Sequence, residues 1–370
     1  MVEFITNVNS AVNGFVWGVP MLVLLVGTGI LMTILTKFFQ LSHLGHWFKN
    51  TVGGIFHDKH VTKHTEAGDQ SISQFQSLCT ALAATIGTGN IVGVASALVA
   101  GGPGAIFWMW VVAFFGMMTN YSENVLGIYY RRRNSKGEWS GGAMYYLKDG
   151  LGSYKGCKQI GAVLAVLFSA FCLLASFGIG NMSQVNSIAA NMTSAFSIPA
   201  TATGIVLVFI GALVIVGGLK RIAAVTEKLV PFMAIAYVIG ALVIFFANIS
   251  HVGAVFTAIF KGAFGLRAVG GGIVGSGVKL ALTWGMKRGV FSNEAGLGSS
   301  VMVHSSSNVK EPVRQGMWGI FEVFADTMVV CTLTAFAVLS SGLIDLDTGA
   351  VLVDVSGSAL VGQAFATVFG

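Results

Sequence analysis

Long apolar runs alternate with short polar segments along most of the chain, and most of the runs are long enough to cross a membrane. A helix needs about 20 apolar residues to span the hydrocarbon layer. The pattern therefore predicts eight spanning helices and the start of a ninth near residue 357. The predicted spans are residues 14–36, 72–100, 104–129, 160–190, 200–218, 229–248, 269–300 (interrupted) and 314–341.

Composition supports a membrane protein and excludes several other classes. The chain is 54% hydrophobic and 10% charged, whereas a soluble domain carries about 25% charged residues. Its basic residues lie between apolar runs rather than in one patch, so nucleic acid is not an expected partner. The four cysteines show no CxxC spacing, so neither a disulfide framework nor a zinc site is indicated. The expected class is an all-α polytopic membrane protein in a lipid bilayer.

The basic residues also predict an orientation. Sixteen of the 21 Lys and Arg residues fall in segments on one side of the predicted spans. Cytoplasmic loops carry such an excess, so we expect the N-terminus outside the cell membrane. The sixteen residues are Lys37, Lys49, Lys59, Lys63, Arg131, Arg132, Arg133, Lys136, Lys148, Lys155, Lys158, Lys220, Arg221, Lys228, Lys310 and Arg314.

One stretch within the second span, TIGTGNIVGV at 85–94, is unusual for a membrane helix. Each Gly weakens a helix by about 1 kcal/mol relative to Ala. Unpaired backbone groups in lipid are tolerated only where they line a cavity. Freed N–H groups suit a carboxylate, and freed carbonyls with threonine hydroxyls suit a cation. The alternative role of these glycines is close helix packing through Gly89 and Gly93.

A second stretch, GVFSNEAGLGSS at 289–300, places another polar break in the seventh span. The predicted orientation makes these two broken spans run in opposite directions, each at the start of a set of five helices. This arrangement is typical of inverted-repeat transporters, which bind their solute between the breaks. We therefore divide the chain into an N-terminal helix with a cytoplasmic loop (1–70), a first five-helix repeat (71–250), and an interfacial amphipathic helix with a partial second repeat (251–370).

Several other polar residues have two possible roles each. Glu322 and Asp326 share a helix face and could bind an ion or form a structural network with Arg314. Glu294 could be a cation ligand or a helix cap. Lys287 and Arg288 precede the second break and could form gate pairs or attract a carboxylate.

Three segments, GTGNIVGVASALVAGGPGAIFWMW (87–110), GGLKRIAAVTEKLVPFMA (217–234) and RGVFSNEAGLGSS (288–300), resemble the alanine or glycine:cation symporter family. The resemblance runs over nearly the whole chain. It implies an extra N-terminal helix followed by five plus five helices, in the inverted-repeat amino-acid-transporter fold, and uptake of alanine or glycine coupled to Na⁺. The second repeat would then be incomplete, because the chain stops at Gly370, and we expect a C-terminally truncated fragment that cannot transport by itself.

The resemblance also implies roles for residues at the matching positions. Substrate binding is expected from the first break, from the facing helix and from the second break. Backbone carbonyls of Gly89 and Val92 would form half of a Na⁺ site. The expected substrate-binding residues are Thr88, Gly89, Asn90 and Gly93, then Phe177, Asn181 and Gln184, whose helical spacing puts them on one face, and Phe291, Ser292 and Asn293.

These observations favour a Na⁺-coupled symporter for a small neutral amino acid that works by alternating access. A membrane enzyme is disfavoured because the chain has neither HExxH nor GxSxG. A channel would need a continuous polar lining, which the fifth and sixth spans lack. No cofactor is expected: GGGIVG at 270–275 fits a dinucleotide motif formally, but no strand precedes it. A proton-coupled carrier and a non-transporting fragment remain alternatives.

Overall fold

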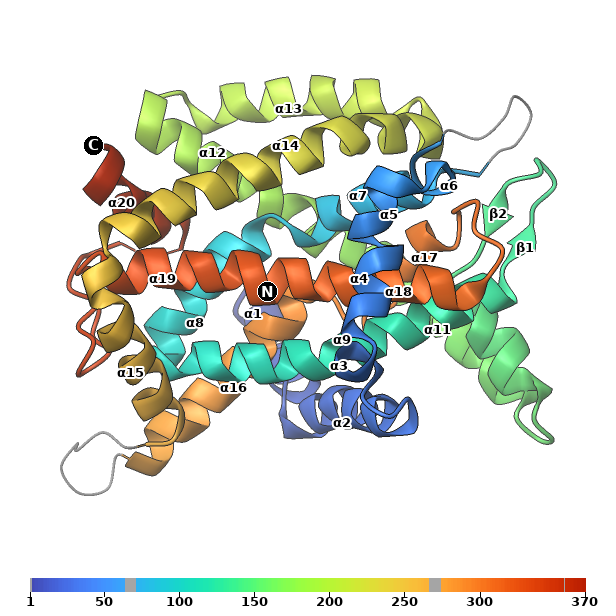
Figure 1. Cartoon of the computed structure of the whole chain (residues 1–370), viewed down its shortest axis with the longest axis horizontal. Helices are drawn as coiled ribbons and strands as arrows, with labels where there is room; N and C mark the ends of the chain where they lie inside the picture. The colour runs from blue at the N-terminus through green and yellow to red at the C-terminus, as the bar shows by residue number, and fades with distance from the viewer. Residues whose placement is uncertain (1, 64–70, 266–273, 356) are drawn as a thin grey trace.

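The computed structural model describes residues 2–63, 71–265, 274–355 and 357–370, and most of these residues are helical (Figure 1). The first part of the chain contains α1 (Val2–Val16), α2 (Val19–Leu35), α3 (Phe39–Ser42), α4 (Leu44–Asn50), α5 (Val52–His57) and α6 (Lys59–Thr62). It continues with α7 (Gln74–Thr85), the π-helix η1 (Gly89–Gly93), α8 (Val94–Gly101) and α9 (Gly104–Tyr130). A short hairpin, β1 (Arg132–Arg133) paired antiparallel with β2 (Trp139–Ser140), follows α9.

The remaining elements are again helices. The middle of the chain forms α10 (Ala143–Tyr145), η2 (Tyr146–Gly150), η3 (Leu151–Ser153), α11 (Lys158–Phe177), η4 (Gly178–Met182), α12 (Ser183–Phe196), α13 (Ala200–Ile215) and α14 (Gly218–Ala247). The last part forms η5 (Ile249–His251), α15 (Val252–Ala263), α16 (Val274–Asn293), α17 (Ser300–His304), α18 (Pro312–Val323), η6 (Phe324–Cys331), α19 (Thr332–Ser340) and α20 (Ser358–Phe369).

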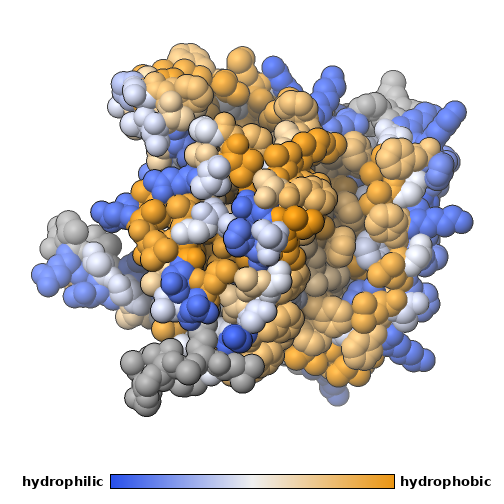
Figure 2. Space-filling view, turned by 60° about the vertical axis from the view of Figure 1, so that its left-hand side comes forward, coloured by the Kyte–Doolittle hydropathy of each residue, from blue (hydrophilic) through white to orange (hydrophobic). Residues whose placement is uncertain are grey.

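The long helices divide into a buried centre and an exposed periphery. Helix α9 lies beside the continuous helix α18–η6–α19 (Figure 1). In an apolar 18-residue stretch of each of these two helices, 61% and 67% of the residues are buried. In the corresponding stretches of α11–α12 and α14, only 11% and 17% of the residues are buried. Figure 2 shows broad hydrophobic areas at the surface, with hydrophilic residues along the right-hand edge and in smaller groups on the left. Such extensive apolar surface is expected where helices face lipid.

Close packing at the centre depends on small residues. A Cβ added to Gly319 of α18 would lie 2.6 Å from the Asn124 Nδ2 and 2.9 Å from the Asn120 carbonyl oxygen of α9. Without side-chain bulk at this position the two backbones approach closely, as small residues allow in membrane helices. On the same helix, Trp318 and Ile320 are fully buried.

The expectation of an all-α polytopic membrane protein is confirmed. Among the described residues, five helices are long and apolar enough to cross a membrane, or six when the bent pair α7 and α8 counts as one span. The predicted span 200–218 corresponds to a helix of 16 residues, α13. The predicted span 269–300 and the GGGIVG stretch both begin outside the described residues, which resume at Val274.

Two boundaries were wrong. The predicted loop between the fifth and sixth spans is absent here, because α14 runs as one helix from Gly218 to Ala247 and includes Lys220, Arg221 and Lys228. The fourth span continues past residue 190 to Phe196. In both cases charged or polar residues were taken as the end of a helix, but residues such as Lys and Arg are good helix formers and do not by themselves end one.

Candidate functional site

The first predicted break is present between α7 and η1. Helix α7 ends at Thr85, and Ile86 has an extended backbone with ψ of 97°. The two halves are bent by 45°. The Gly87 N–H, which has no helical partner, donates to the Asn90 Oδ1 at 2.8 Å. Because the last carbonyls of one helix and the first N–H groups of the next lack partners within their own helices, the break offers both donors and acceptors.

The second predicted break follows α16. Asn293 is the last helical residue, and Glu294 has a φ of 55°, a left-handed conformation that ends the helix. Gly296 and Gly298 also have positive φ values, 90° and 73°, which glycine adopts without steric penalty. The chain then turns into the short helix α17. Polar and glycine residues at this point thus interrupt the span as the sequence indicated.

The two breaks meet at a buried carboxyl group, Asp326, which is fully shielded from solvent. The Asn90 Nδ2 donates to its Oδ1 at 2.6 Å. The Ser292 and Thr327 hydroxyls donate to its Oδ2 at 2.9 and 2.7 Å. Asp326 lies on the π-helix η6, a stretch of wider turns within the continuous helix α18–η6–α19. One carboxyl group therefore joins three elements that are far apart in the sequence.

A small cavity of about 90 Å³, here called the break cavity, lies beside this junction. Its polar groups come from the first break, from α12 and from the second break. The Gln184 Oε1 accepts a hydrogen bond of 3.3 Å from the Thr88 N–H, and the buried Thr85 hydroxyl has no partner among the described residues. The lining residues are Ala83, Ala84, Thr85, Thr88, Gly89, Ile179, Gly180, Gln184, Phe291 and Glu294.

Four residues expected to bind substrate line this cavity: Thr88, Gly89, Gln184 and Phe291. Phe177 and Asn181 do not. Both side chains are exposed, Phe177 by 62%. The α-helical spacing used to place them on the face of Gln184 does not hold here, because Asn181 lies within the π-helix η4 and Phe177 directly precedes it. A π-turn inserts an extra residue and rotates the residues after it by about 100°, so Ile179 and Gly180 face the cavity instead.

Asn90, Ser292 and Asn293 are close to the cavity but do not line it. Asn90 and Ser292 contact Asp326, and the Asn293 Nδ2 donates to the Thr327 hydroxyl at 3.1 Å. Their side chains are thus used to join the breaks. The acidic side chain that reaches the cavity from the second break is Glu294, whose carboxylate accepts a hydrogen bond from the Ser299 hydroxyl.

Gly93 and Val92 lie one turn further along η1, outside the cavity lining. The nearest atom to a Cβ on Gly93 would be 3.8 Å away, whereas a Cβ on Gly89 would lie 2.9 Å from the Ser292 Cα. Gly89 is therefore the glycine that lets the two breaks touch. The Val92 carbonyl accepts from the Ser96 hydroxyl at 2.6 Å. Thr85 and Thr88, whose hydroxyls the sequence suggested for a cation, both line the break cavity.

Glu322 belongs to a separate buried network. The His304 Nε2 lies 3.1 Å from the Glu322 Oε2, and the Asn120 Nδ2 donates to the same oxygen at 3.0 Å. The Gln315 amide lies 2.5 Å from the other ring nitrogen of His304. This network connects the short helix α17 to α9 and α18 through one oxygen of Glu322, while the other, Oε1, has no hydrogen-bond partner among the described residues.

Arg314, which the sequence suggested as a partner of Glu322 and Asp326, pairs with Asp58 instead. This contact ties the loop around α6 to the start of α18. The Arg314 guanidinium, helped by the His60 backbone N–H, holds the pKa of Asp58 below its ordinary value. The pairing was not visible in the sequence because 256 residues separate the two groups.

Comparison with known proteins identifies the family of the chain. The sequence model of the sodium:alanine symporter family matches residues 2–370. The sodium/alanine symporter AgcS of Methanococcus maripaludis is 46% identical over 363 residues, which cover 98% of this chain and 76% of that protein. A putative sodium/proton-dependent alanine carrier protein, YrbD of Bacillus subtilis, is 39% identical over 93% of this chain and 65% of its own length.

The substrates named among the relatives differ. The probable sodium/glutamine symporter GlnT of Bacillus subtilis is 35% identical over 92% of this chain and 67% of its own length. The family match extends to residue 370 and gives no support to the expected C-terminal truncation. The family and these relatives are named as transporters and not as enzymes, in agreement with the expectation from the sequence. The chain therefore belongs to the sodium:alanine symporter family and is a cation-coupled amino-acid symporter.

Proposed function

We propose that this symporter takes up a small neutral amino acid, alanine or glycine, together with Na⁺, and that the break cavity binds the amino acid. The observation that carries the proposal is the set of groups around this cavity. The cavity of about 90 Å³ is lined by residues at the end of α7 and at the start of η1, by Thr85, whose hydroxyl is unpaired among the described residues, and by the acidic residue Glu294. A zwitterion and a dehydrated cation need these groups together.

Each end of the amino acid has a partner in this proposal. Its carboxylate accepts from the N–H groups at the start of η1 and from the Gln184 amide, where the helix dipole favours negative charge. Its ammonium group faces Glu294. The carbonyls that end α7 and the Thr85 hydroxyl hold Na⁺, since hard cations prefer oxygen ligands. The name of the AgcS relative supports alanine and sodium.

The cavity walls account for a preference for small side chains. Phe291 and Ile179 close one side, and Ala83 and Ala84 line another part. One extra methylene in such a site changes affinity by about 1–3 kcal/mol. We also propose that the protein lies in the cell membrane with its N-terminus outside, as the distribution of basic residues predicts.

Alternating access in this proposal uses the junction at Asp326. When Na⁺ and the amino acid occupy the cavity, they bridge the first and second breaks and stabilise their closed arrangement. The element carrying Asp326 moves with both breaks, because Asn90 and Ser292 bind the same carboxyl group. Rocking of this group of helices against the others then opens the cavity to the other side.

Uptake of labelled alanine into proteoliposomes tests the proposal. We expect accumulation driven by an inward Na⁺ gradient, and none with K⁺ in its place. A second set of vesicles carries a proton gradient without Na⁺, because one relative is named as sodium/proton-dependent. Accumulation under the proton gradient alone would favour proton coupling. Absence of alanine uptake under every gradient would contradict the proposed substrate.

A further inference from the structure

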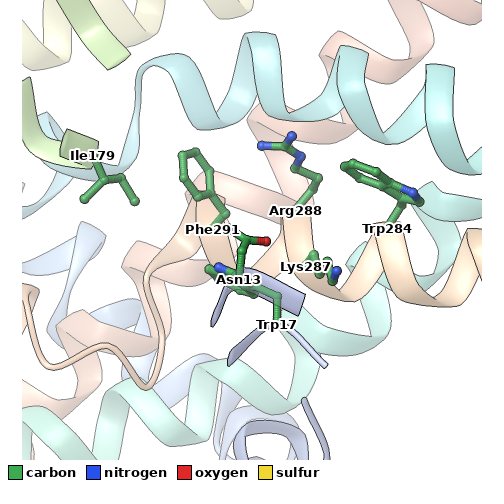
Figure 3. A pocket seen from close by; sticks show the side chains of 7 residues that line it. All are labelled: Asn13, Trp17, Ile179, Trp284, Lys287, Arg288 and Phe291. Carbon is green, nitrogen blue, oxygen red and sulfur yellow. The ribbon is translucent and has the colours of Figure 1, made fainter. Parts of the chain in front are cut away.

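A second and larger cavity, here called the Arg288 chamber, lies next to the break cavity. Its volume is about 350 Å³, roughly four times that of the break cavity. It is lined by Asn13, Trp17, Ile179, Trp284, Lys287, Arg288 and Phe291, shown together in Figure 3. Ile179 and Phe291 line both spaces, so these two side chains form the partition between them.

One face of α16 supplies most of this lining. Trp284, Lys287, Arg288 and Phe291 have the spacing i, i+3, i+4 and i+7, which aligns side chains along one side of a helix. Arg288 precedes Ser292 by one turn, about 6 Å along the helix axis. The chamber therefore lies one turn before the second break, on the side from which α16 approaches it.

The charges of the chamber are not neutralised within the part of the chain that the structure describes. There, no carboxylate forms an ion pair with Lys287 or Arg288. The Arg288 guanidinium instead lies 5.3 Å from the Trp284 ring centroid and 5.6 Å from that of Phe291. Figure 3 shows it projecting between these two rings. Cation–π contacts hold the guanidinium in place while leaving its N–H groups available for hydrogen bonding.

We propose that the Arg288 chamber is a second amino-acid site, which holds the carboxylate of an incoming amino acid before Phe291 admits it to the break cavity. This inference rests on the proposed function for its role in transport. A planar guanidinium binds a carboxylate through two parallel hydrogen bonds, and Lys287 adds a second positive charge. The rings of Trp17 and Trp284 give the apolar part of the ligand a surface to contact.

The difference in volume gives the chamber a broader ligand range. An amino acid with a large aliphatic side chain fits a space of about 350 Å³ but not one of about 90 Å³. Leucine is therefore expected to bind in the chamber, to inhibit alanine uptake and not to be transported itself. Alanine and glycine alone pass the partition formed by Phe291 and Ile179.

Binding of labelled leucine to the purified full chain in detergent, measured by scintillation proximity, tests the site. Loss of a charge-assisted hydrogen-bond pair weakens binding by about 10- to 100-fold. We expect Arg288→Gln to lower leucine affinity by at least about tenfold, and Arg288→Lys, which keeps the charge but not the planar fork, to lower it less. Lys279→Gln, on the same helix but outside the chamber, is the matched control and should bind leucine like the wild type.

Gln184→Ala separates the two sites, and labelled alanine measured in the same samples separates the two proposals. Leucine binding that survives Gln184→Ala but not Arg288→Gln supports the chamber. The reverse pattern, or no leucine binding to the wild type, overturns it. If alanine binding is Na⁺-dependent and leucine does not bind, the chamber alone is refuted. If leucine binding depends on Arg288 while alanine never binds, the chamber stands and the proposed function fails.

Discussion

Asn90 is expected to stabilise the junction between the breaks rather than to contact substrate, and replacing it by Ala tests this distinction. The substitution removes the donor that lies 2.6 Å from the Asp326 carboxyl oxygen and the acceptor of the Gly87 N–H at 2.8 Å. A hydrogen bond to a charged group contributes about 1.5–3 kcal/mol, and an unpaired buried donor costs about 1–3 kcal/mol. Together these losses destabilise the protein by about 3–5 kcal/mol.

Gln184→Ala is the informative comparison because Gln184 lines the cavity. It loses one neutral hydrogen bond of 3.3 Å, worth about 0.5–1 kcal/mol. With about 2–4 °C in Tm for each kcal/mol in a chain of a few hundred residues, Asn90→Ala should lower Tm by about 6–20 °C and Gln184→Ala by about 1–4 °C. For alanine binding the order should reverse, with the larger loss of affinity in Gln184→Ala.

Thermal unfolding and alanine binding are measured on the same purified variants, with Asn191→Ala as control. Asn191 is exposed and donates only to a carbonyl of its own helix, so neither quantity should change. If Asn90→Ala keeps the Tm of the wild type and loses alanine binding, the structural role assigned to Asn90 is refuted, since Asn90 would then act as a ligand.

Two further predictions concern the first break and the loop before it. Gly89→Ala should destabilise the protein by about 1–3 kcal/mol, because the added Cβ would lie 2.9 Å from the Ser292 Cα. Gly93→Ala should be tolerated, because no atom would lie closer than 3.8 Å to its Cβ. Equal effects of the two substitutions on Tm would show that the breaks do not touch. The pKa of Asp58 lies below its ordinary value of 3.8, so the ion pair between Asp58 and Arg314 is fully formed at neutral pH and remains so down to that value. The ion pair is lost only as the pH falls through the lowered pKa. A spin label on His57→Cys should therefore become more mobile only at pH values below about 3.8. In the Asp58→Asn background the label should be mobile at every pH. A change in mobility near neutral pH would show that the ion pair of Asp58 does not hold this loop.

The breaks themselves could be predicted from the sequence, because glycine and polar residues within an apolar run are costly in a membrane unless the groups they free are used. The identity of the inward-facing residues could not be predicted fully. Phe177 and Asn181 were assigned by α-helical spacing, and the π-helix η4 changed that spacing. Nothing in GIGNM at 178–182 distinguishes a π-turn from a flexible α-helical turn.

Asp326 shows a second limit of sequence reasoning. Its position in an apolar span marked it as a candidate, but its partners Asn90 and Ser292 lie 236 and 34 residues away. The Asn90 and Ser292 side chains, which were expected to bind substrate, donate to this carboxyl group instead. A buried carboxyl group requires hydrogen-bond donors, yet only the fold determines which donors reach it.

The most direct test of a cation and amino-acid site in the break cavity is equilibrium binding of labelled alanine to the purified chain in NaCl and in choline chloride, for the wild type and for Thr85→Val. Valine keeps the shape of threonine but removes the free hydroxyl that lines the break cavity. We predict that the wild type binds alanine only with Na⁺, and that Thr85→Val needs a higher Na⁺ concentration for the same occupancy. Equal alanine binding in both salts, or an unchanged Na⁺ requirement in Thr85→Val, would contradict a cation site in the break cavity.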